Sequence, residues 1–151
     1  MNSYSRFGLM IVTSTIVMFG VMYLNSYDII AHMYWSETRA YMALMMAATM
    51  AVVMLAYMLG MYRNRGLNFA IFAAAVVVFV AALALLRSQV IVDDVDYMEA
   101  MIPHHSIAIL TSKRAQITDP RVRELADGII AAQEREIARM RSLIVELKPE
   151  N

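Results

Sequence analysis

The sequence predicts an all-α protein with three transmembrane helices followed by a two-helix hairpin outside the membrane. Apolar residues make up 60% of the 151-residue chain and charged residues only 17%. The long uncharged runs lie before Arg87, whereas most of the charged residues follow it. This split indicates a membrane domain over residues 1–90 and a water-facing domain over residues 91–151.

Three uncharged runs approach or reach the roughly 20 residues that cross a bilayer core. They cover residues 7–24, 41–62 and 67–86. The first run resembles the core of a signal peptide, but Leu24-Asn25-Ser26-Tyr27 after it offers no small-residue cleavage site. We therefore expect three retained transmembrane helices.

Basic residues near the ends of these runs predict the orientation. Arg6 precedes the first run, and Arg63 and Arg65 lie between the second and third. Three spans place these segments on one side, which we expect to be cytoplasmic. Residues 25–40 and the chain after Arg87 then lie outside. The expected location is a bacterial inner membrane, with a periplasmic C-terminal domain.

Methionine recurs along the second run at every fourth position: Met42, Met46, Met50, Met54 and Met58. Steps of four keep these side chains on one slowly rotating ridge. The ridge has two interpretations, a thioether path for Cu(I) or Ag(I) and adaptable packing between helices. We favour packing because no charged residue or histidine accompanies the ridge inside the membrane.

The C-terminal domain is predicted to contain helices over residues 93–115 and 120–147. Acidic residues in the first turn of the earlier helix interact favourably with the positive end of the helix dipole. This interaction explains their presence more simply than a site that attracts cations. Asp119 followed by Pro120 is a typical helix start. Pro149 should end the second helix.

Side chains spaced alternately four and three residues apart mark the face on which the two helices meet. On the second helix this series is Ala126, Ile130, Gln133, Ile137, Met140, Ile144 and Leu147. On the first helix it is Met98, Met101, His105 and Ala108. Antiparallel packing then brings His105 and Met101 near Gln133. It also brings Met98 near Met140.

The predicted meeting point is rich in donors for a soft metal ion. The chain has no cysteine, which suits an oxidising exterior and leaves thioether and imidazole as the soft ligands. His104 and Glu136 lie at the flanks of the same face. The candidate metal ligands are Met98, Met101, His104, His105, Gln133, Glu136 and Met140. We expect a copper ion, with zinc on His104, His105 and Glu136 as the alternative.

A metal-free interpretation of the same residues also exists. Adjacent helical residues point about 100° apart, so His104 and His105 rarely chelate one ion together. Pro103 removes one backbone hydrogen bond and should bend the helix just before them. His105 could then be a buried side chain bonded to Gln133, with His104 exposed. His32 could add a ligand or be a polar side chain at the membrane surface.

A hairpin of about 55 residues buries too little surface to be stable alone. It needs the membrane surface, the loop over residues 25–40, or a second copy. Two hairpins would complete a four-helix bundle, so we expect a homo-oligomer, a dimer or higher. The lipid bilayer is the other expected partner. The net charge is zero and no basic patch indicates nucleic-acid binding.

The run DYMEAMIPHHSIAI at residues 96–109 resembles the start of domain-of-unknown-function family 305. So do Leu125-Ala126, Ile129-Ile130, Gln133, Glu136-Ile137 and Met140. The resemblance covers about residues 93–147 and implies a ferritin-like helical fold, here a half bundle. The membrane half is similar to a subgroup with amino-terminal spans. Some members are periplasmic copper binders, and the pattern marks the seven candidate ligands. Thr111 stands where many members carry a methionine, which would leave a site here one sulfur poorer.

The leading hypothesis is a membrane-anchored extracytoplasmic copper-binding protein that acts in sensing, buffering or resistance. The second is a structural homo-oligomer in which the Met/His/Gln face fixes helix packing without any metal. A ferritin-like metalloenzyme would need Glu-x-x-His spacing. The nearest glutamate, Glu99, lies five residues before His104, so we do not expect an enzyme.

Overall fold

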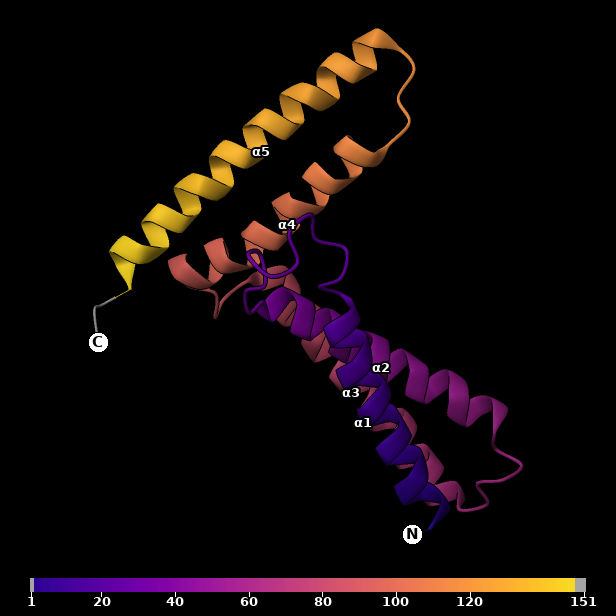
Figure 1. Cartoon of the computed structure of the whole chain (residues 1–151). Coiled ribbons are helices and arrows are strands. Elements are labelled where there is room, and N and C mark those ends of the chain that lie inside the picture. Colours follow the sequence, from indigo (N-terminus) through magenta and orange to yellow (C-terminus); the bar gives the residue numbers. More distant parts are fainter. Residues whose placement is uncertain (1, 149–151) are drawn as a thin grey trace. The chain divides into compact units, whose positions relative to one another are not determined.

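The computed structural model describes residues 2–148 and contains five α-helices and no β-strand within that range (Figure 1). The helices are α1 (Ser3–Val21), α2 (Glu37–Tyr57), α3 (Arg65–Ser88), α4 (Asp94–Arg114) and α5 (Pro120–Leu147). The prediction of an all-α chain is confirmed. The expected helix stop at Pro149 lies outside the described residues.

The chain forms two compact units. The first contains α1, α2 and α3, over residues up to Met22 and from Glu37 to Ile91. The second contains α4 and α5 together with the loop Tyr23–Ser36. The sequence assigned residues 1–90 to one domain, whereas this loop packs with the C-terminal helices.

The first two helices begin earlier than the uncharged runs that predicted them. α1 starts at Ser3 because the Asn2 side chain accepts a hydrogen bond from the Ser5 backbone N–H at 2.7 Å and caps the helix. α2 starts at Glu37 and carries Arg39 in its first turn. A search for uncharged runs misses such starts because a capped helix end tolerates polar residues.

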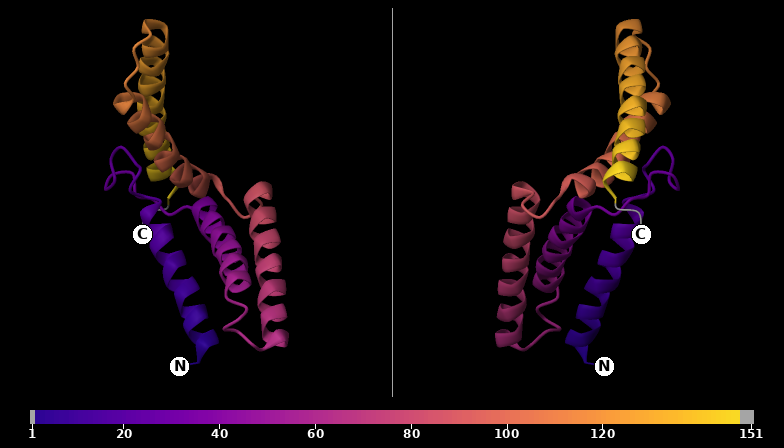
Figure 2. Two further views of the ribbon diagram at one scale, coloured as in Figure 1. Left: turned by 90° about the vertical axis from the view of Figure 1, so that its right-hand side faces the viewer. Right: turned by 90° about the vertical axis from the view of Figure 1, so that its left-hand side faces the viewer.

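In the first unit, α2 packs between α1 and α3 (Figure 2). The buried side chains shared by these helices and their connection are Phe7, Ala48, Ala51, Leu55, Tyr62 and Ala75. The alanines let the helices approach closely. All three helices are long and apolar enough to cross a membrane. Their outward surfaces are mostly apolar and exposed, which is typical of helices surrounded by lipid.

The methionine ridge of α2 is only partly enclosed by this unit. Met42 and Met46 are exposed, and Met54 and Met58 pack against the buried cluster. This partial burial is what adaptable packing predicts.

In the second unit, α4 and α5 lie side by side and run in opposite directions (Figure 1). Lys113 near the end of α4 pairs with Glu134, and Glu99 near its start pairs with Lys148 just after α5. The buried cluster between the helices consists of Met98, Ile102, Ile109, Ile137 and Ile144. The predicted series on α5 largely faces this cluster, although Leu147 at its end is exposed.

The loop Tyr23–Ser36 covers a second side of α4. The Ser106 hydroxyl accepts a hydrogen bond from the Tyr27 backbone N–H at 2.8 Å and lies 2.8 Å from Nδ1 of His32. Both Ser106 and His32 are buried. Tyr34 packs against the cluster between α4 and α5, and Arg141 of α5 donates a hydrogen bond to the Ala31 carbonyl.

The face of α4 that meets α5 differs from the predicted one by one position. The series Met98, Met101, His105 and Ala108 was expected to face α5. In the structure the buried side chains of α4 are Met98, Ile102, Pro103, Ser106 and Ile109, and Met101 and Ala108 are only half-buried. Ile102 and Ile109, each one position after the predicted Met101 and Ala108, pack in the cluster with Ile137 and Ile144 of α5. Ser106 is the residue that the loop covers.

Candidate metal centre

The histidine pair lies in the middle of α4, which continues without a break through Pro103. The Asp93 side chain caps the helix by accepting a hydrogen bond from the Asp96 backbone N–H at 2.8 Å. His104 is exposed, whereas only 15% of the His105 side chain is accessible. The two ring centroids are 6.1 Å apart with the rings tilted by 59°. The pair therefore points in two directions, as helical geometry requires.

His105 contacts Glu136 of α5 across the helix pair. Its Nδ1 atom lies 3.1 Å from Oε2 of Glu136. The contact is short but poorly directed, so the buried Nδ1 atom lacks a well-formed hydrogen bond. The Gln133 amide approaches the same Glu136 oxygen at 3.4 Å. Gln133 thus reaches Glu136 and not His105, unlike the pairing in the metal-free interpretation.

His105 and Glu136 help to line a groove of about 440 Å³ between α4 and α5. The lining residues are Asp94, Tyr97, Met98, His105, Glu136, Arg139, Met140, Leu143 and Leu147. Two thioethers and one imidazole therefore border the same space, with a carboxylate beside the imidazole. Asp94 and Arg139 add charge to a lining that also contains Leu143 and Leu147, and the groove is open to solvent.

The surroundings of His105 favour its neutral form. Burial lowers the pKa of His105 below its usual 6.5, the Glu136 carboxylate raises that pKa, and His104 lowers it. The net direction is downward. The imidazole is therefore neutral at pH 7, which is the form that binds metal ions.

The structure gathers four of the seven candidate ligands around the groove: Met98, His105, Glu136 and Met140. Gln133 joins them through its contact with Glu136. Met101 is half-buried and His104 exposed, and neither lines the groove. Asp94 and Arg139 were not predicted, although Arg139 lies one helical turn after Glu136 and that spacing indicates the same face.

Within residues 2–148, no three His, Asp or Glu side chains come together in a way that could hold a metal ion. The zinc alternative needs such a group. A soft ion does not, because thioether sulfurs can supply part of its coordination. Among the residues that line the groove, the soft donors are Met98, Met140 and His105.

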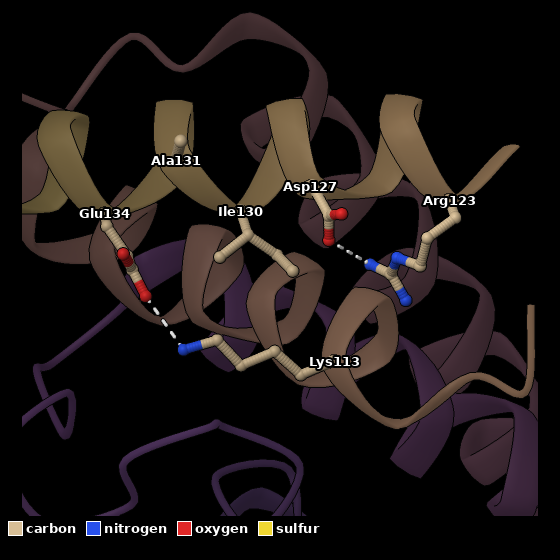
Figure 3. A pocket seen from close by; sticks show the side chains of 6 residues that line it. All are labelled: Lys113, Arg123, Asp127, Ile130, Ala131 and Glu134. Atoms are coloured by element: carbon tan, nitrogen blue, oxygen red, sulfur yellow. Dashed lines mark hydrogen bonds and ion pairs between the residues drawn. The ribbon is translucent and has the colours of Figure 1, made fainter. Parts of the chain in front are cut away.

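The opposite flank of the α4–α5 pair carries a different groove, of about 560 Å³ (Figure 3). Its charged side chains form two ion pairs, Lys113 with Glu134 at 2.9 Å and Arg123 with Asp127 at 2.8 Å. Ile130 and Ala131 complete the lining. Each of these charges already has a partner of opposite sign, and the groove has no sulfur donor.

The buried contact between Ser106 and His32 was missed by sequence reasoning. His32 was expected to be a possible ligand or a surface residue, yet only 8% of it is exposed. Its partner lies 74 residues away along the chain, and no spacing pattern in the sequence predicts a contact over that separation. Burial lowers the pKa of His32, the Arg141 charge lowers it further, and Asp28 raises it.

Comparisons with known proteins agree with this helical unit. The model of the family "Domain of unknown function (DUF305)" matches residues 81–149, which include α4 and α5. A curated relative, "Uncharacterized protein L153" of Acanthamoeba polyphaga mimivirus, is 35% identical over 113 residues, covering 74% of this chain and 72% of that protein. The aligned length exceeds the family region, so the similarity includes part of the apolar helices. No solved structure matches the chain. The resemblance seen in the sequence is confirmed, and the chain belongs to the DUF305 family.

Proposed function

We propose that this protein is a membrane-anchored metal-binding protein whose α4–α5 unit binds copper as Cu(I) outside the cytoplasm. One observation supports this most strongly. The His105 imidazole, of which 15% is accessible, borders a groove that two thioethers also line, and Glu136 lies beside its Nδ1 atom. Imidazole and thioether together are ligands that Cu(I) prefers.

The residues of the groove would have different roles in binding the ion. Met98, Met140 and His105 would hold the ion. Glu136 would hold the His105 ring through Nδ1, as carboxylates next to metal-bound histidines commonly do, and Nε2 would then be the nitrogen for the ion. Gln133 would fix Glu136 in turn. Copper supplies no chemistry in this proposal beyond being bound, so the role is buffering or resistance and not catalysis.

The proposed orientation follows from the three apolar helices and their flanking charges. α1, α2 and α3 would cross the membrane with Arg6, Arg63 and Arg65 on the cytoplasmic side. An odd number of spans then places α4 and α5 on the outer side, where an oxidising environment suits a site without cysteine. Modification of introduced single cysteines by a membrane-impermeant reagent tests this orientation.

Metal titration of the purified full-length protein tests the binding proposal. Cu(I) and Ag(I) are added against a competing chelator, with Zn(II) in parallel. We expect about one soft ion per chain, loss of binding in His105→Ala, and at least tenfold weaker binding in the double variant Met98→Leu, Met140→Leu. Leucine preserves most of the methionine volume, so this variant removes sulfur with little change in packing.

Met101→Leu and His104→Ala are the matched controls, because neither residue lines the groove. Both should bind the ion as the unmodified protein does. A protein that takes up no Cu(I), Ag(I) or Zn(II), or takes up equal amounts after loss of both histidines, would refute the proposal.

A structural role for the same polar contact is the alternative. The contact chain from His105 through Glu136 to Gln133 links α4 to α5 and could fix their register without any metal. This alternative predicts that Gln133→Leu changes the size of the assembly, measured by native mass, and that metal has no effect on it. An unchanged assembly in Gln133→Leu counts against it.

A further inference from the structure

The loop Tyr23–Ser36 leaves three large apolar side chains uncovered by its own unit. Ile30 is 89% exposed, Trp35 58% and Met33 56%. We call these three residues the apolar patch of the loop. Asp28 is the only Asp, Glu, Lys or Arg in the loop. Loops that face water are usually polar, so an apolar patch on a loop with so little charge indicates an apolar partner.

The exposure of the patch does not arise from a loop without contacts. The loop is bound to the helix pair, since Nδ1 of His32 lies 2.8 Å from the Ser106 hydroxyl of α4 and Arg141 of α5 donates a hydrogen bond to the Ala31 carbonyl. The loop is also bonded to itself. The Asp28 side chain accepts a hydrogen bond from the Ala31 backbone N–H at 2.9 Å, and the Asp28 carbonyl accepts one from the His32 backbone N–H at 3.1 Å. The patch is therefore presented by a backbone that is fixed to α4 and α5.

Both ends of the loop continue into helices that are apolar enough to cross a membrane. Tyr23 follows the end of α1 by two residues, and Ser36 directly precedes Glu37, where α2 begins. If α1 and α2 cross the bilayer one after the other, the two ends of the loop lie at the same bilayer surface. Lipid is therefore the partner that the chain itself holds next to the patch.

The size and composition of the patch suit lipid better than a protein partner. Three side chains expose less than the roughly 800 Å² that each partner contributes to a standard protein interface. Insertion into lipid has no such minimum, because binding grows with the apolar area that is buried. Tryptophan is also enriched where the hydrocarbon meets the head groups. With Asp28 as the one charge nearby, attraction to charged head groups is not the driving force.

We propose that the loop inserts Ile30, Met33 and Trp35 into the adjoining lipid leaflet and thereby anchors the α4–α5 unit to the membrane surface. The site for these side chains is the upper part of the acyl chains, and no particular head group is needed. Because the loop is bonded to Ser106 and Arg141, insertion restricts the motion of α4 and α5 relative to the bilayer. The inference rests on the proposed membrane spans and requires no metal ion.

Quenching of tryptophan fluorescence by brominated lipids tests the insertion in the full-length protein, because Trp35 is the only tryptophan. Ile30→Trp is made in a Trp35→Phe chain, and single chains are placed in nanodiscs of phosphatidylcholine brominated near the top of the acyl chains. We expect at least a threefold loss of emission. Leu125→Trp in the same background is the control, because Leu125 is 65% exposed and lies roughly 24 Å along α5 from Arg141. Its emission should change by less than a fifth. Equal quenching at positions 30 and 125, or no quenching at position 30, overturns the inference.

A tryptophan inside α1 separates failure of this inference from failure of the proposed spans. Ile16→Trp replaces an exposed residue of α1 in the Trp35→Phe chain. Lipid brominated in the middle of the acyl chains should quench it whether or not the loop inserts. Quenching at position 16 without quenching at position 30 overturns the loop inference and leaves the spans intact. No quenching at position 16 refutes the spans and the inference together.

A charge placed in the patch provides the second test. Ile30→Asp and Asn25→Asp each add one negative charge at an exposed position of the loop, but only the first removes an apolar side chain. Ile30→Asp should reduce the quenching of Trp35 by the lipid brominated near the top of its chains at least twofold, whereas Asn25→Asp should leave it unchanged. Adding phosphatidylglycerol should have no effect, because the patch is uncharged. Equal quenching in both variants, or quenching that requires phosphatidylglycerol, contradicts the inference.

Discussion

The α4–α5 unit contains two largely buried histidines with opposite surroundings. Nδ1 of His32 lies 2.8 Å from the Ser106 hydroxyl, which also accepts the Tyr27 N–H, so its polar contact is complete. Nδ1 of His105 has only a poorly directed contact with Glu136 and borders the thioether groove. Burial alone therefore does not distinguish a structural histidine from a ligand. The partners do, because His32 has a short polar contact with Ser106, whereas His105, the imidazole of the proposed metal site, has a poorly directed contact with Glu136.

Removal of His32 should have the largest effect on stability. His32→Ala leaves a cavity under the loop and deprives Ser106 of a partner, so we expect a loss of about 3 kcal/mol in the free energy of unfolding. His105→Ala should cost less than half as much because its imidazole has no comparable bond. Chemical denaturation followed by the fluorescence of Trp35, the single tryptophan, measures both. Equal losses would remove the distinction between the two histidines.

Copper should stabilise the protein through one histidine only. At a hundred times the dissociation constant, a ligand that binds only the folded state adds about 2.7 kcal/mol. We expect a corresponding rise in Tm for the unmodified protein, a rise of similar size for His32→Ala, and none for His105→Ala. Thermal unfolding with Cu(I) held by a weak chelator provides the measurement. A rise that survives in His105→Ala would place the ion elsewhere.

Acid should weaken the unit through both histidines. Burial holds the pKa of each below the usual 6.5, so the unfolded chain binds protons more readily than the folded one. Their stabilising contribution is complete above about pH 6.5 and declines as the pH falls below that value. Denaturation midpoints between pH 7.5 and 5 check this. His32→Gln and His105→Gln should each reduce the change of the denaturation midpoint with pH. An unchanged pH dependence in both variants would contradict this prediction.

The sequence predicted the helices well because each one depends on local signals. Asp119 followed by Pro120 placed the start of α5 at the observed residue, and the uncharged runs located α1, α2 and α3. The candidate site was predicted in part, since the four-and-three spacing brought Met98 and Met140 to one face. Met101 is half-buried and does not line the groove, and the Gln133 amide reaches Glu136 instead of His105.

The packing of the loop could not be predicted from the sequence because its contacts join residues that are far apart along the chain. His32 and Ser106 are 74 residues apart, and neither belongs to a repeating pattern. On α4 the residues that pack with α5 include Ile102 and Ile109, each one position after the predicted Met101 and Ala108. A shift of one residue changes which side chains border a groove, so site geometry was less predictable than helix position.

Met101 should show the smallest effect of the residues compared. It is half-buried and does not line the groove. Met101→Leu preserves volume and should change the free energy of unfolding by less than about 1 kcal/mol. Cu(I) binding should be unchanged in the same titration. A loss of binding comparable to that of Met98→Leu would mean that α4 presents a different face to the ion.

X-ray absorption spectroscopy of the Cu(I)-loaded full-length protein tests the central claim most directly, because it identifies the atoms bound to the ion. We expect sulfur scattering from Met98 and Met140 together with a single imidazole nitrogen from His105. The His32→Ala protein should give the same spectrum, and Met98→Leu, Met140→Leu should lose the sulfur contribution. A spectrum with only nitrogen and oxygen neighbours, or with two imidazoles, would contradict it.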